Sequence, residues 1–342
     1  MMSPSYPTRK LGKNGPQVTS IGWGAMGLSA FYGTIKPDNE RLALLDQLYD
    51  LGQRNWDSAD MYGDSEDLLG KWFKANPDKR ANIFLATKFA NGRSENGDRW
   101  VNSSPEYAKQ ACAKSLKRLN VDYIDLYYCH RQDPKVPIEQ TVRAMAELQK
   151  EGKIKYIGLS ECSATSLRRA CKIAHIDAVQ LEYSPFSLDI EKPEIDLLKT
   201  ARELGVAVVA YSPLGRGMIG TKARSTDDFP DDDFRKGLPR FQGENFKKNI
   251  ELSDKFVSMA KSKGCTATQL ALAWLLAQDD NVIPIPGSTN LERIKENMGA
   301  LEVKLTKEEL SEIRKASEAS EPAGTRYPEA MMGYSFVDTV EE

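Results

Sequence analysis

The sequence predicts an α/β protein with a (β/α)8 barrel (TIM barrel), because short apolar runs alternate with amphipathic stretches along most of the chain. The run Val206 to Ala210 is apolar throughout, as in a strand that is buried on both faces. Between such runs, apolar residues recur every three to four positions, which is typical of helices that pack against a sheet. Eight strand–helix units, an N-terminal β-hairpin and two extra helices fit a chain of 342 residues. No repeat or low-complexity linker interrupts this pattern, so we expect residues 1–342 to form one domain.

The first elements are a hairpin and a glycine-rich segment. Residues 8–11 and 17–21 are predicted to pair as a β-hairpin around a tight turn at Asn14-Gly15. Residues 22–27 have the pattern G-x-G-x-x-G, which in a Rossmann fold opens the first helix. Here the next helix is predicted to begin near Pro37, so we interpret the glycines as a loop above the strand at Ile21.

The remaining elements follow in order, and several carry local start and stop signals. The helix that opens at Ser104 has a capping serine, Pro105 at its first position and Glu106 in its first turn. Gly152 and Gly205 are expected to end two later helices. The predicted strands lie at 54–57, 83–87, 123–129, 155–159, 178–181, 206–210 and 282–285, the predicted helices at 37–51, 65–73, 104–119, 138–150, 167–174, 195–201, 246–263, 266–277, 291–301 and 305–317, and a long loop rich in Gly, Pro and Asp at 212–245.

The composition narrows the possible classes of function. With 40% hydrophobic residues, 28% charged residues and a formal net charge of −2, the chain is typical of soluble globular proteins and lacks the basic runs of a nucleic-acid binder. The polar start lacks the apolar core of a signal peptide, and no run is long enough to span a membrane, so we expect a cytoplasmic protein without a membrane partner. Five scattered cysteines and two histidines predict neither a disulfide framework nor a metal site.

Polar side chains stand at the ends of four predicted strands. Asp57, Lys88, His130 and Tyr211 each close a strand, and Tyr62 follows five residues after Asp57. In a parallel barrel the carboxyl ends of all strands lie on one face, where ligands and chemistry collect. Each of these residues alone has a common structural role, as a helix cap, a solvated cation or a packing ring. An acid, a cation, an imidazole and a phenol on one face together indicate a proton-transfer site.

Short motifs recur along nearly the whole chain. They are DSA at 57–59 with Tyr62, LATK at 85–88, SLKRL at 115–119, YIDL at 123–126 with His130, GKI at 152–154, YSPL at 211–214 and IPGS at 285–288. As a set these motifs are highly specific, and they resemble the aldo-keto reductase superfamily, in particular its branch with fungal and plant pyridoxal reductases and auxin-induced-type reductases. The resemblance implies a barrel enzyme that reduces a small-molecule aldehyde or ketone with NADPH.

The resemblance implies a catalytic tetrad of Asp57, Tyr62, Lys88 and His130. A carbonyl group that accepts hydride at carbon needs a proton at oxygen, and a phenol with a pKa of about 10 is a poor acid at neutral pH. The ammonium of Lys88, held by Asp57, is expected to lower the pKa of Tyr62 by stabilising the phenolate. His130 is expected to orient the substrate carbonyl by donating a hydrogen bond.

The resemblance also implies which residues hold NADPH. The nicotinamide carboxamide would lie against Ser160 and Gln180, and the 2′-phosphate would face Arg293. Two residues depart from the family pattern: Glu161 stands where many members have Asn, and Gly287 stands where other branches have Lys. The second departure predicts a preference for NADPH without strict exclusion of NADH. The full set of expected cofactor contacts is Ala25, Met26, Ser160, Gln180, Tyr211, Ser212, Leu214, Gly217, Ser288, Arg293 and Asn297.

Several segments are expected to border the site. By resemblance, residues 212–245 form a loop that covers the cofactor, and Tyr211 just before it stacks on the nicotinamide ring. The substrate pocket is expected to be built from aromatic-rich segments, which favours aldehydes with an apolar or ring-shaped body. These segments are Trp23, residues 31–32, residues 89–101 and the tail 321–342 around Tyr327.

Two other functions remain open from the sequence. A buried lysine at a strand end can be a nucleophile, so Lys88 is compatible with a carbon–carbon lyase of the Schiff-base type. An ion pair with Asp57 opposes this interpretation, because it keeps the amine protonated. A cofactor-sensing scaffold without turnover, like the related channel-associated subunits, is the other alternative, although the tetrad is complete. For the oligomeric state we favour a monomer.

Overall fold

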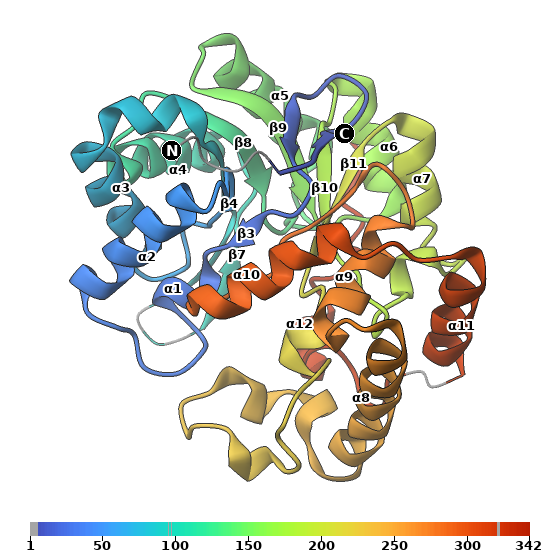
Figure 1. The fold of residues 1–342 in the computed structure, drawn as a ribbon. Coiled ribbons are helices and arrows are strands. Elements are labelled where there is room, and N and C mark those ends of the chain that lie inside the picture. Colours follow the sequence, from blue (N-terminus) through green and yellow to red (C-terminus); the bar gives the residue numbers. More distant parts are fainter. Residues whose placement is uncertain (1–5, 95, 97, 320–321) are drawn as a thin grey trace.

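The chain folds as a barrel of eight parallel strands, here seen in a computed structural model (Figure 1). The structure describes residues 6–94, 96, 98–319 and 322–342, so the first residue of the predicted tail, Glu321, lies outside it. Backbone hydrogen bonds from Gly22 to Pro284 (2.9 Å) and from Gly24 to Pro286 (3.2 Å) join the first strand to the last and close the sheet. In chain order, which is also their order in the sheet, the strands are β3 (Trp23–Gly24), β4 (Asn55–Asp57), β5 (Phe84–Phe89), β8 (Ile124–Cys129), β9 (Ile154–Ser160), β10 (Ala178–Glu182), β11 (Ala207–Tyr211) and β12 (Val282–Pro284).

Helices surround the strands, which lie in the middle of the view in Figure 1. The alternation of strands and helices that the sequence predicts is therefore confirmed, including α5 with both of its predicted ends. The helices are α1 (Met26–Ser29), α2 (Asp38–Asp50), α3 (Ser65–Ala75), α4 (Pro105–Leu119), α5 (Ile138–Lys150), α6 (Ala164–Ile173), α7 (Leu197–Leu204), α8 (Gly243–Lys263), α9 (Ala267–Leu276), α10 (Leu291–Gly299), α11 (Lys307–Glu318) and α12 (Glu329–Met332).

Local signals set the ends of these helices as expected. The Ser104 hydroxyl accepts a hydrogen bond from the Tyr107 N–H (3.3 Å) at the start of α4, directly before Pro105. Gly205 ends α7 in the left-handed conformation (φ +70°), which glycine adopts without the Cβ penalty of other residues. Periodicity marks Ala108, Ala111, Cys112, Ser115, Leu116 and Leu119 as the inner face of α4, and all of these are buried except Leu116, which is half-buried.

The N-terminal hairpin closes one end of the barrel. Its strands β1 (Thr8–Lys10) and β2 (Gln17–Thr19) pair antiparallel, and Leu11 and Val18 pack onto the side chains that fill the barrel interior. Lys13 donates its N–H to the Gly205 carbonyl oxygen (2.8 Å), just before β11 begins. The hairpin therefore covers the amino-terminal ends of the strands and leaves the carboxyl ends to the site.

Two predictions near the N-terminus are wrong in detail. The hairpin connection spans Leu11 to Pro16, closed by a hydrogen bond between these residues (2.9 Å), and is longer than the tight turn expected at Asn14-Gly15. A one-turn helix, α1, begins at Met26, inside the glycine-rich segment where only a loop was expected. It is not the long helix of a Rossmann fold, because the first long helix is α2, which begins after Pro37.

A small hairpin follows β5 where the sequence suggested a loop. Strands β6 (Asn91–Arg93) and β7 (Arg99–Val101) pair antiparallel. The Trp100 ring packs over Gly92, where a Cβ would lie only 2.3 Å from the ring. A strand signal is weak here because each strand has three residues, and the pairing depends on the close approach of one ring to one glycine.

The segment between β11 and α8 has no strand or α-helix of its own, as expected for the predicted loop. It does contain four short 3-10 helices, and it ends at residue 242 rather than 245 because α8 begins at Gly243. Phe229, Phe241 and Phe246 hold it by mutual ring contacts, with centroids 5.7–5.8 Å apart. The 3-10 helices are η3 (Gly215–Gly217), η4 (Thr226–Asp228), η5 (Phe234–Gly237) and η6 (Pro239–Phe241).

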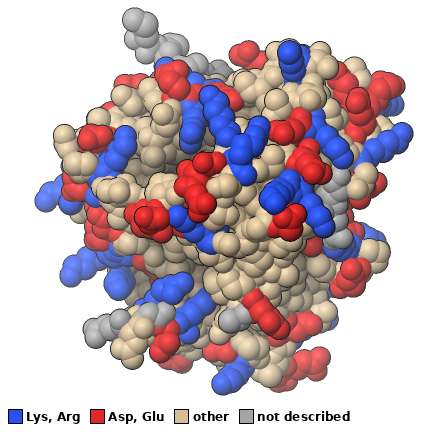
Figure 2. Space-filling model, turned by 90° about the horizontal axis from the view of Figure 1, so that it is seen from below, with Lys and Arg blue, Asp and Glu red and all other residues tan. Residues whose placement is uncertain are grey.

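The surface carries charges of both signs. On the face shown in Figure 2, basic and acidic side chains are interspersed with uncharged residues, and no large area of one sign is visible there. This agrees with the formal net charge of −2. None of the helices in the described ranges is both long and apolar enough to cross a membrane.

Candidate active site

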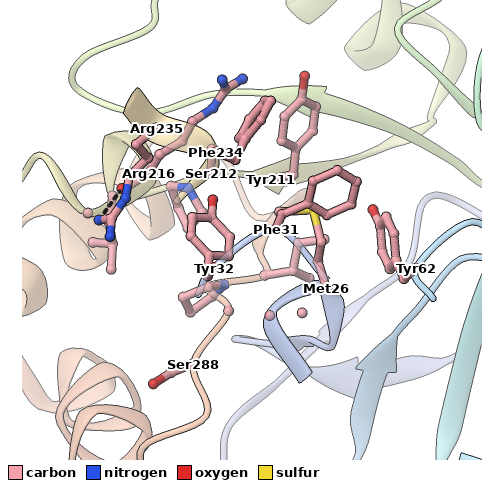
Figure 3. A pocket seen from close by; sticks show the side chains of 18 of the residues that line it. Met26, Phe31, Tyr32, Tyr62, Tyr211, Ser212, Arg216, Phe234, Arg235 and Ser288 are labelled. Carbon is pink, nitrogen blue, oxygen red and sulfur yellow. Dashed lines mark hydrogen bonds between the residues drawn. The ribbon is translucent and has the colours of Figure 1, made fainter. Parts of the chain in front are cut away.

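A cavity of about 970 Å³ opens at the carboxyl ends of the strands. Its wall comes from the ends of β3, β4, β9 and β11, the segments after β8 and β12, the loop before α8 and the tail. In Figure 3, Tyr62 and Ser288 lie at different sides of this lining, with the rings of Phe31 and Tyr32 between them. The cavity therefore reaches from the end of β4 to the segment after β12, at the upper end of the roughly 300–1,000 Å³ typical of ligand pockets.

The base of the site is a buried ion pair. The Lys88 ammonium, in β5, donates to Asp57 Oδ1 and to the Ser58 carbonyl oxygen (2.6 Å). Gln180 Nε2 donates to the other oxygen, Asp57 Oδ2 (2.8 Å). Burial lowers the pKa of Lys88 and raises that of Asp57, and the mutual attraction of the two charges opposes both shifts. Asp57 lines the cavity, whereas Lys88 lies behind it, fully buried.

Tyr62 and His130 meet at the cavity wall. Their rings are edge to face with centroids 5.9 Å apart, and the Lys88 Nζ lies 5.2 Å from the centroid of the Tyr62 ring. Burial, followed by the charge of Asp57, raises the pKa of Tyr62 above its usual value. The expectation of a lowered pKa is therefore wrong in direction, since burial and the charge of Asp57 outweigh the positive charge of Arg131, which acts in the opposite sense. The phenol stays protonated at neutral pH.

His130 is neutral in this environment. Burial lowers its pKa well below the usual 6.5, and the positive charges of Arg131, Lys88 and Arg99 lower it further. Its Nδ1 is buried and has no hydrogen-bond partner among the described residues. A neutral imidazole can donate one hydrogen bond to a ligand in the cavity, which is what the sequence-based role requires.

Arg131 is a site residue that the sequence analysis missed. It is 6% exposed and lines the cavity, and its Nη1 donates to the His130 carbonyl oxygen (2.6 Å) and to Ser160 Oγ (3.3 Å). It thereby links two residues of the predicted site. Its place directly after His130, at the end of β8, was the one available signal, but an arginine at a strand end is more commonly exposed.

All but one of the predicted cofactor residues line the cavity. The exception is Ala25, which is fully buried and uses its N–H to bond the Asp57 carbonyl oxygen (2.8 Å). Those that line it are Met26, Ser160, Gln180, Tyr211, Ser212, Leu214, Gly217, Ser288, Arg293 and Asn297.

The segment before α10 forms the far end of the cavity. The Asn290 side chain caps α10 by accepting the Arg293 N–H (3.1 Å), so this N–H is not available to a phosphate. The Arg293 side chain is exposed and lines the cavity. Gly287 forms an isolated parallel bridge with Gly24, and a Cβ at Gly287 would lie 3.1 Å from the Gly24 carbonyl oxygen. A side chain at residue 287 would therefore require the Gly24 backbone to shift by a few tenths of an ångström.

Glu161 does not face the cavity but anchors the tail. It lies in the left-handed backbone region (φ +53°), fully buried, and its carboxylate forms an ion pair with Arg326 (3.1 Å). Oε1 also accepts from the Tyr211 hydroxyl (3.0 Å) and from the Glu182 N–H (3.1 Å). Burial by itself raises the pKa of Glu161, but the charges of Arg326 and Arg131 outweigh it and lower this pKa to about 2.

The tail and the long loop meet over the same end of the barrel. The Tyr327 and Tyr211 hydroxyls are 3.2 Å apart, and Tyr327 also lines the cavity. Arg216, in the long loop, donates to the Arg326 carbonyl oxygen (2.9 Å) and forms an ion pair with Glu182 (2.8 Å). No sequence pattern connects these residues, because the tail lies more than a hundred positions from its partners.

The loop also reaches across the cavity to the segment after α1. The Phe234 N–H donates to the Phe31 carbonyl oxygen (3.2 Å), and the two rings are in edge contact with centroids 5.6 Å apart. Figure 3 shows the Phe234 ring beside Tyr211 and the Phe31 ring towards Tyr62. The loop is thus joined to the segment after α1 by a hydrogen bond and a ring contact.

The residues present fit a dinucleotide with an anionic far end. Hydroxyl and amide groups of Ser160, Gln180 and Asn297 line the wall, and the Tyr211 ring offers a flat surface. The Arg293 guanidinium has no ion-pair partner within the described ranges, so it is available to an anionic group. An elongated cavity with a flat ring near one end and a cation at the other matches a nicotinamide dinucleotide phosphate.

Comparison with protein families gives one match over most of the chain. The family described as "Aldo/keto reductase family" matches residues 20–318. Aldo-keto reductase str7 of Strobilurus tenacellus is 50% identical over 340 residues, which cover 98% of each chain. Aldo-keto reductase yakc of Schizosaccharomyces pombe, whose name carries NADP(+), is 47% identical over 338 residues, again 98% of each chain.

Solved structures with similar folds are also reductases or dehydrogenases by name. A glycerol dehydrogenase from Gluconobacter oxydans superimposes with a TM-score of 0.81 at 26% identity, over 93% of this chain and 97% of that one. The holo form of an aldo-keto reductase from Bacillus halodurans superimposes with a TM-score of 0.74 at 28% identity, over 94% of this chain and 98% of that one.

Proposed function

The chain belongs to the aldo/keto reductase family, and from that premise we propose that it reduces an aldehyde or ketone to the alcohol, with NADPH as its cofactor. The observation that carries the proposal is the meeting of Tyr62 and His130 at one point of the cavity wall, above the buried pair of Asp57 and Lys88. A proton donor and a hydrogen-bond donor converge there on the position of a single oxygen atom.

The roles follow from the protonation states. Tyr62 is protonated at neutral pH, so its hydroxyl transfers a proton to the substrate oxygen as negative charge develops there. His130 is neutral and donates a hydrogen bond to the same oxygen, which holds the carbonyl in place. Lys88 stabilises the resulting phenolate, and Asp57 and Gln180 hold the base of the site. The cofactor, when bound, supplies the hydride to the carbonyl carbon.

We assign cofactor binding to the residues that line the cavity beyond Tyr62. Ser160 and Gln180 lie beside each other in paired strands and would hold the carboxamide, with the Tyr211 ring against the nicotinamide. Ser288 and Arg293 would hold the 2′-phosphate. Residues 212–245 would cover the cofactor, and the tail from residue 321 would border the substrate through Tyr327.

The lyase alternative is disfavoured by the position of its nucleophile. Lys88 is fully buried, does not line the cavity and is bonded to Asp57 and to the Ser58 carbonyl oxygen. A substrate carbonyl in the cavity would meet the Tyr62 hydroxyl rather than the amine. The scaffold alternative is disfavoured because Tyr62 and His130 line the cavity and Lys88 is paired with Asp57, an arrangement that a scaffold without turnover would not need.

Replacement of Tyr62 by Phe tests the proposal. The variant keeps the aromatic ring, so the affinity for NADPH is expected to change little. This affinity is measured by the quenching of intrinsic fluorescence. Turnover with NADPH and a panel of aromatic aldehydes is expected to fall by about 10² or more, the usual contribution of general acid catalysis. A Tyr62→Phe enzyme that retains wild-type kcat at saturating substrate would show that another group delivers the proton.

A further inference from the structure

Two arginines lie beside the reacting groups at the substrate end of the cavity. We use "substrate end" for the part lined by Tyr62, His130, Arg99, Arg131 and Tyr327. These residues are close enough to affect one another, since Arg131 and Arg99 both lower the pKa of His130 and Arg131 also acts on Tyr62. Neither arginine has a part in the proton transfer described above.

Arg131 carries a buried charge without a carboxylate partner. It is 6% exposed, and no ion pair within 4 Å joins it to a described acid. The charge of Glu161 acts on Arg131 without a direct contact, and the oxygens of Glu161 are bonded to Arg326, Tyr211 and the Glu182 N–H. Arg131 therefore has no carboxylate in direct contact, and an anionic group in the cavity could form a charge-assisted hydrogen bond with it.

The geometry of Arg131 leaves one edge of its guanidinium for a ligand. Nη1 is used by the His130 carbonyl oxygen and Ser160 Oγ. Nε and Nη2 make no hydrogen bond within the part of the chain that the structure describes. Two parallel N–H groups on one edge of a fixed arginine match the two oxygens of a carboxylate.

Arg99 adds a second positive charge from the β6–β7 hairpin. Its Nε donates to Asn91 Oδ1 (3.0 Å), and its guanidinium lies over the Tyr334 ring, 4.6 Å from the centroid. These contacts fix its direction but do not neutralise it, and no described acid pairs with it. Burial, followed by the charge of Arg131, lowers the pKa of Arg99, which agrees with two cations near one point.

The acids of the cavity do not compensate for these cations. The acidic residues among the lining are Asp57, Asp233 and Glu296. Asp57 is paired with Lys88, and Asp233 is paired with Arg235. Glu296 belongs to α10, at the far end of the cavity. The substrate end is therefore positive, and the charge lies within reach of the group that is reduced.

We propose that the substrate is an aldehyde or ketone that also carries a carboxylate, bound by Arg131 and Arg99 while its carbonyl oxygen lies at Tyr62 and His130. The inference rests on the proposed function and names its substrate class. Phe31, whose ring contacts Tyr62, and Tyr327 also line the cavity, so an aromatic substrate body suits it. The cations of the far end are separate and remain for the cofactor phosphates.

Matched substrates test the proposal directly. The three isomers of carboxybenzaldehyde are each compared with their methyl esters, which have the same ring and aldehyde but no charge. One charge-assisted hydrogen bond changes affinity about tenfold to a hundredfold. We expect kcat/KM with NADPH for the best acid to exceed that of its ester by about tenfold or more. Equal values, or faster reduction of the esters for all three isomers, would overturn the proposal.

Variants locate the effect. Arg99→Met is expected to lower the acid-to-ester ratio of kcat/KM about tenfold, mainly through KM for the acid, whereas Arg99→Lys keeps part of it. Arg202→Met is the matched control, because Arg202 lies on α7, pairs with Asp279 outside the cavity and should leave the ratio unchanged. A ratio that Arg99→Met does not alter would remove Arg99 from the site.

A binding measurement separates this inference from the proposed function. Benzoate and methyl benzoate are titrated against the full chain with NADP+ present, by calorimetry, and phenyl phosphate is a third ligand. Tighter binding of benzoate than of methyl benzoate supports the carboxylate site, whether or not any aldehyde is turned over. An absence of aldehyde turnover would refute the proposed reductase activity instead. Binding of benzoate no tighter than of its ester, or tighter binding of phenyl phosphate, would refute the carboxylate assignment.

Discussion

Glu161→Gln removes one charge from the anchor of the tail and nearly nothing else. Glutamine has the same length, and its amide oxygen can still accept from the Tyr211 hydroxyl and the Glu182 N–H, as Glu161 does. What is lost is the ion pair with Arg326, a residue that is itself only 3% exposed, together with the attraction between Glu161 and Arg131. The substitution therefore measures the electrostatic contribution of Glu161, most of which comes from the tail residue Arg326.

The structure sets the size of the expected effect. The pKa of Glu161 falls from the usual 4.5 to about 2, which corresponds to about 3 kcal/mol at about 1.36 kcal/mol per unit. Removing one partner of a buried ion pair typically lowers the stability by about 3–5 kcal/mol, because the other charge stays buried without its partner. Glu182 lies 3.8 Å from Arg326 and retains part of the compensation, so we expect about 3 kcal/mol.

The pH dependence of this contribution has a definite sign. The folded-state pKa lies below the unfolded value, so the stabilisation is complete above about pH 4.5 and is lost as the pH falls towards 2. Wild-type protein should therefore lose the tail contact in this acidic window. The Gln variant should show no loss from this pair there, since its side chain does not titrate.

Hydrogen exchange followed by mass spectrometry is the suitable assay, because the tail can detach without unfolding the barrel. Backbone amides of residues 322–342 should exchange faster in Glu161→Gln, with the barrel strands unchanged. The double variant Glu161→Gln with Arg326→Met removes both charges and should recover part of the protection. Wild-type protection of the tail in the single variant would refute the electrostatic anchor.

Three further predictions follow from the same structure. Arg293→Ala should weaken the binding of NADPH about tenfold and barely change the binding of NADH in fluorescence titrations. This is the lower end of the range for a charge-assisted hydrogen bond, because the Arg293 side chain is exposed. Equal weakening of both cofactors would assign Arg293 to another role. Asp57→Asn leaves a fully buried ammonium without its carboxylate and should lower the midpoint of thermal unfolding together with kcat; an unchanged midpoint would contradict this. Gly158→Ala should destabilise by about 1–3 kcal/mol in urea unfolding, because its Cβ would lie 2.3 Å from a neighbouring ring, whereas Gly237→Ala, with open space around it, should be close to neutral.

Much of the fold was readable from local patterns. Helix α5 has the bounds that its periodicity predicts, and the Ser104 cap and the Gly205 stop lie where their residue types indicate. The position of Asp57 at the end of a strand was also readable, since a short apolar run ends there. These features depend on residues within a few positions of one another, which is the range over which periodicity and capping act.

The sequence by itself thus determined the barrel and the meeting of Tyr62 with His130, because strand order and strand ends place both on one face. Only the tertiary structure decided that Glu161 holds Arg326, a partner 165 positions away, and that Arg131 is buried beside His130. It also decided the direction of the Tyr62 pKa, which burial and the charge of Asp57 raise against the opposing charge of Arg131. Such properties depend on how much water the packed chain excludes and on which distant charges it brings together, and neither quantity is set by local sequence.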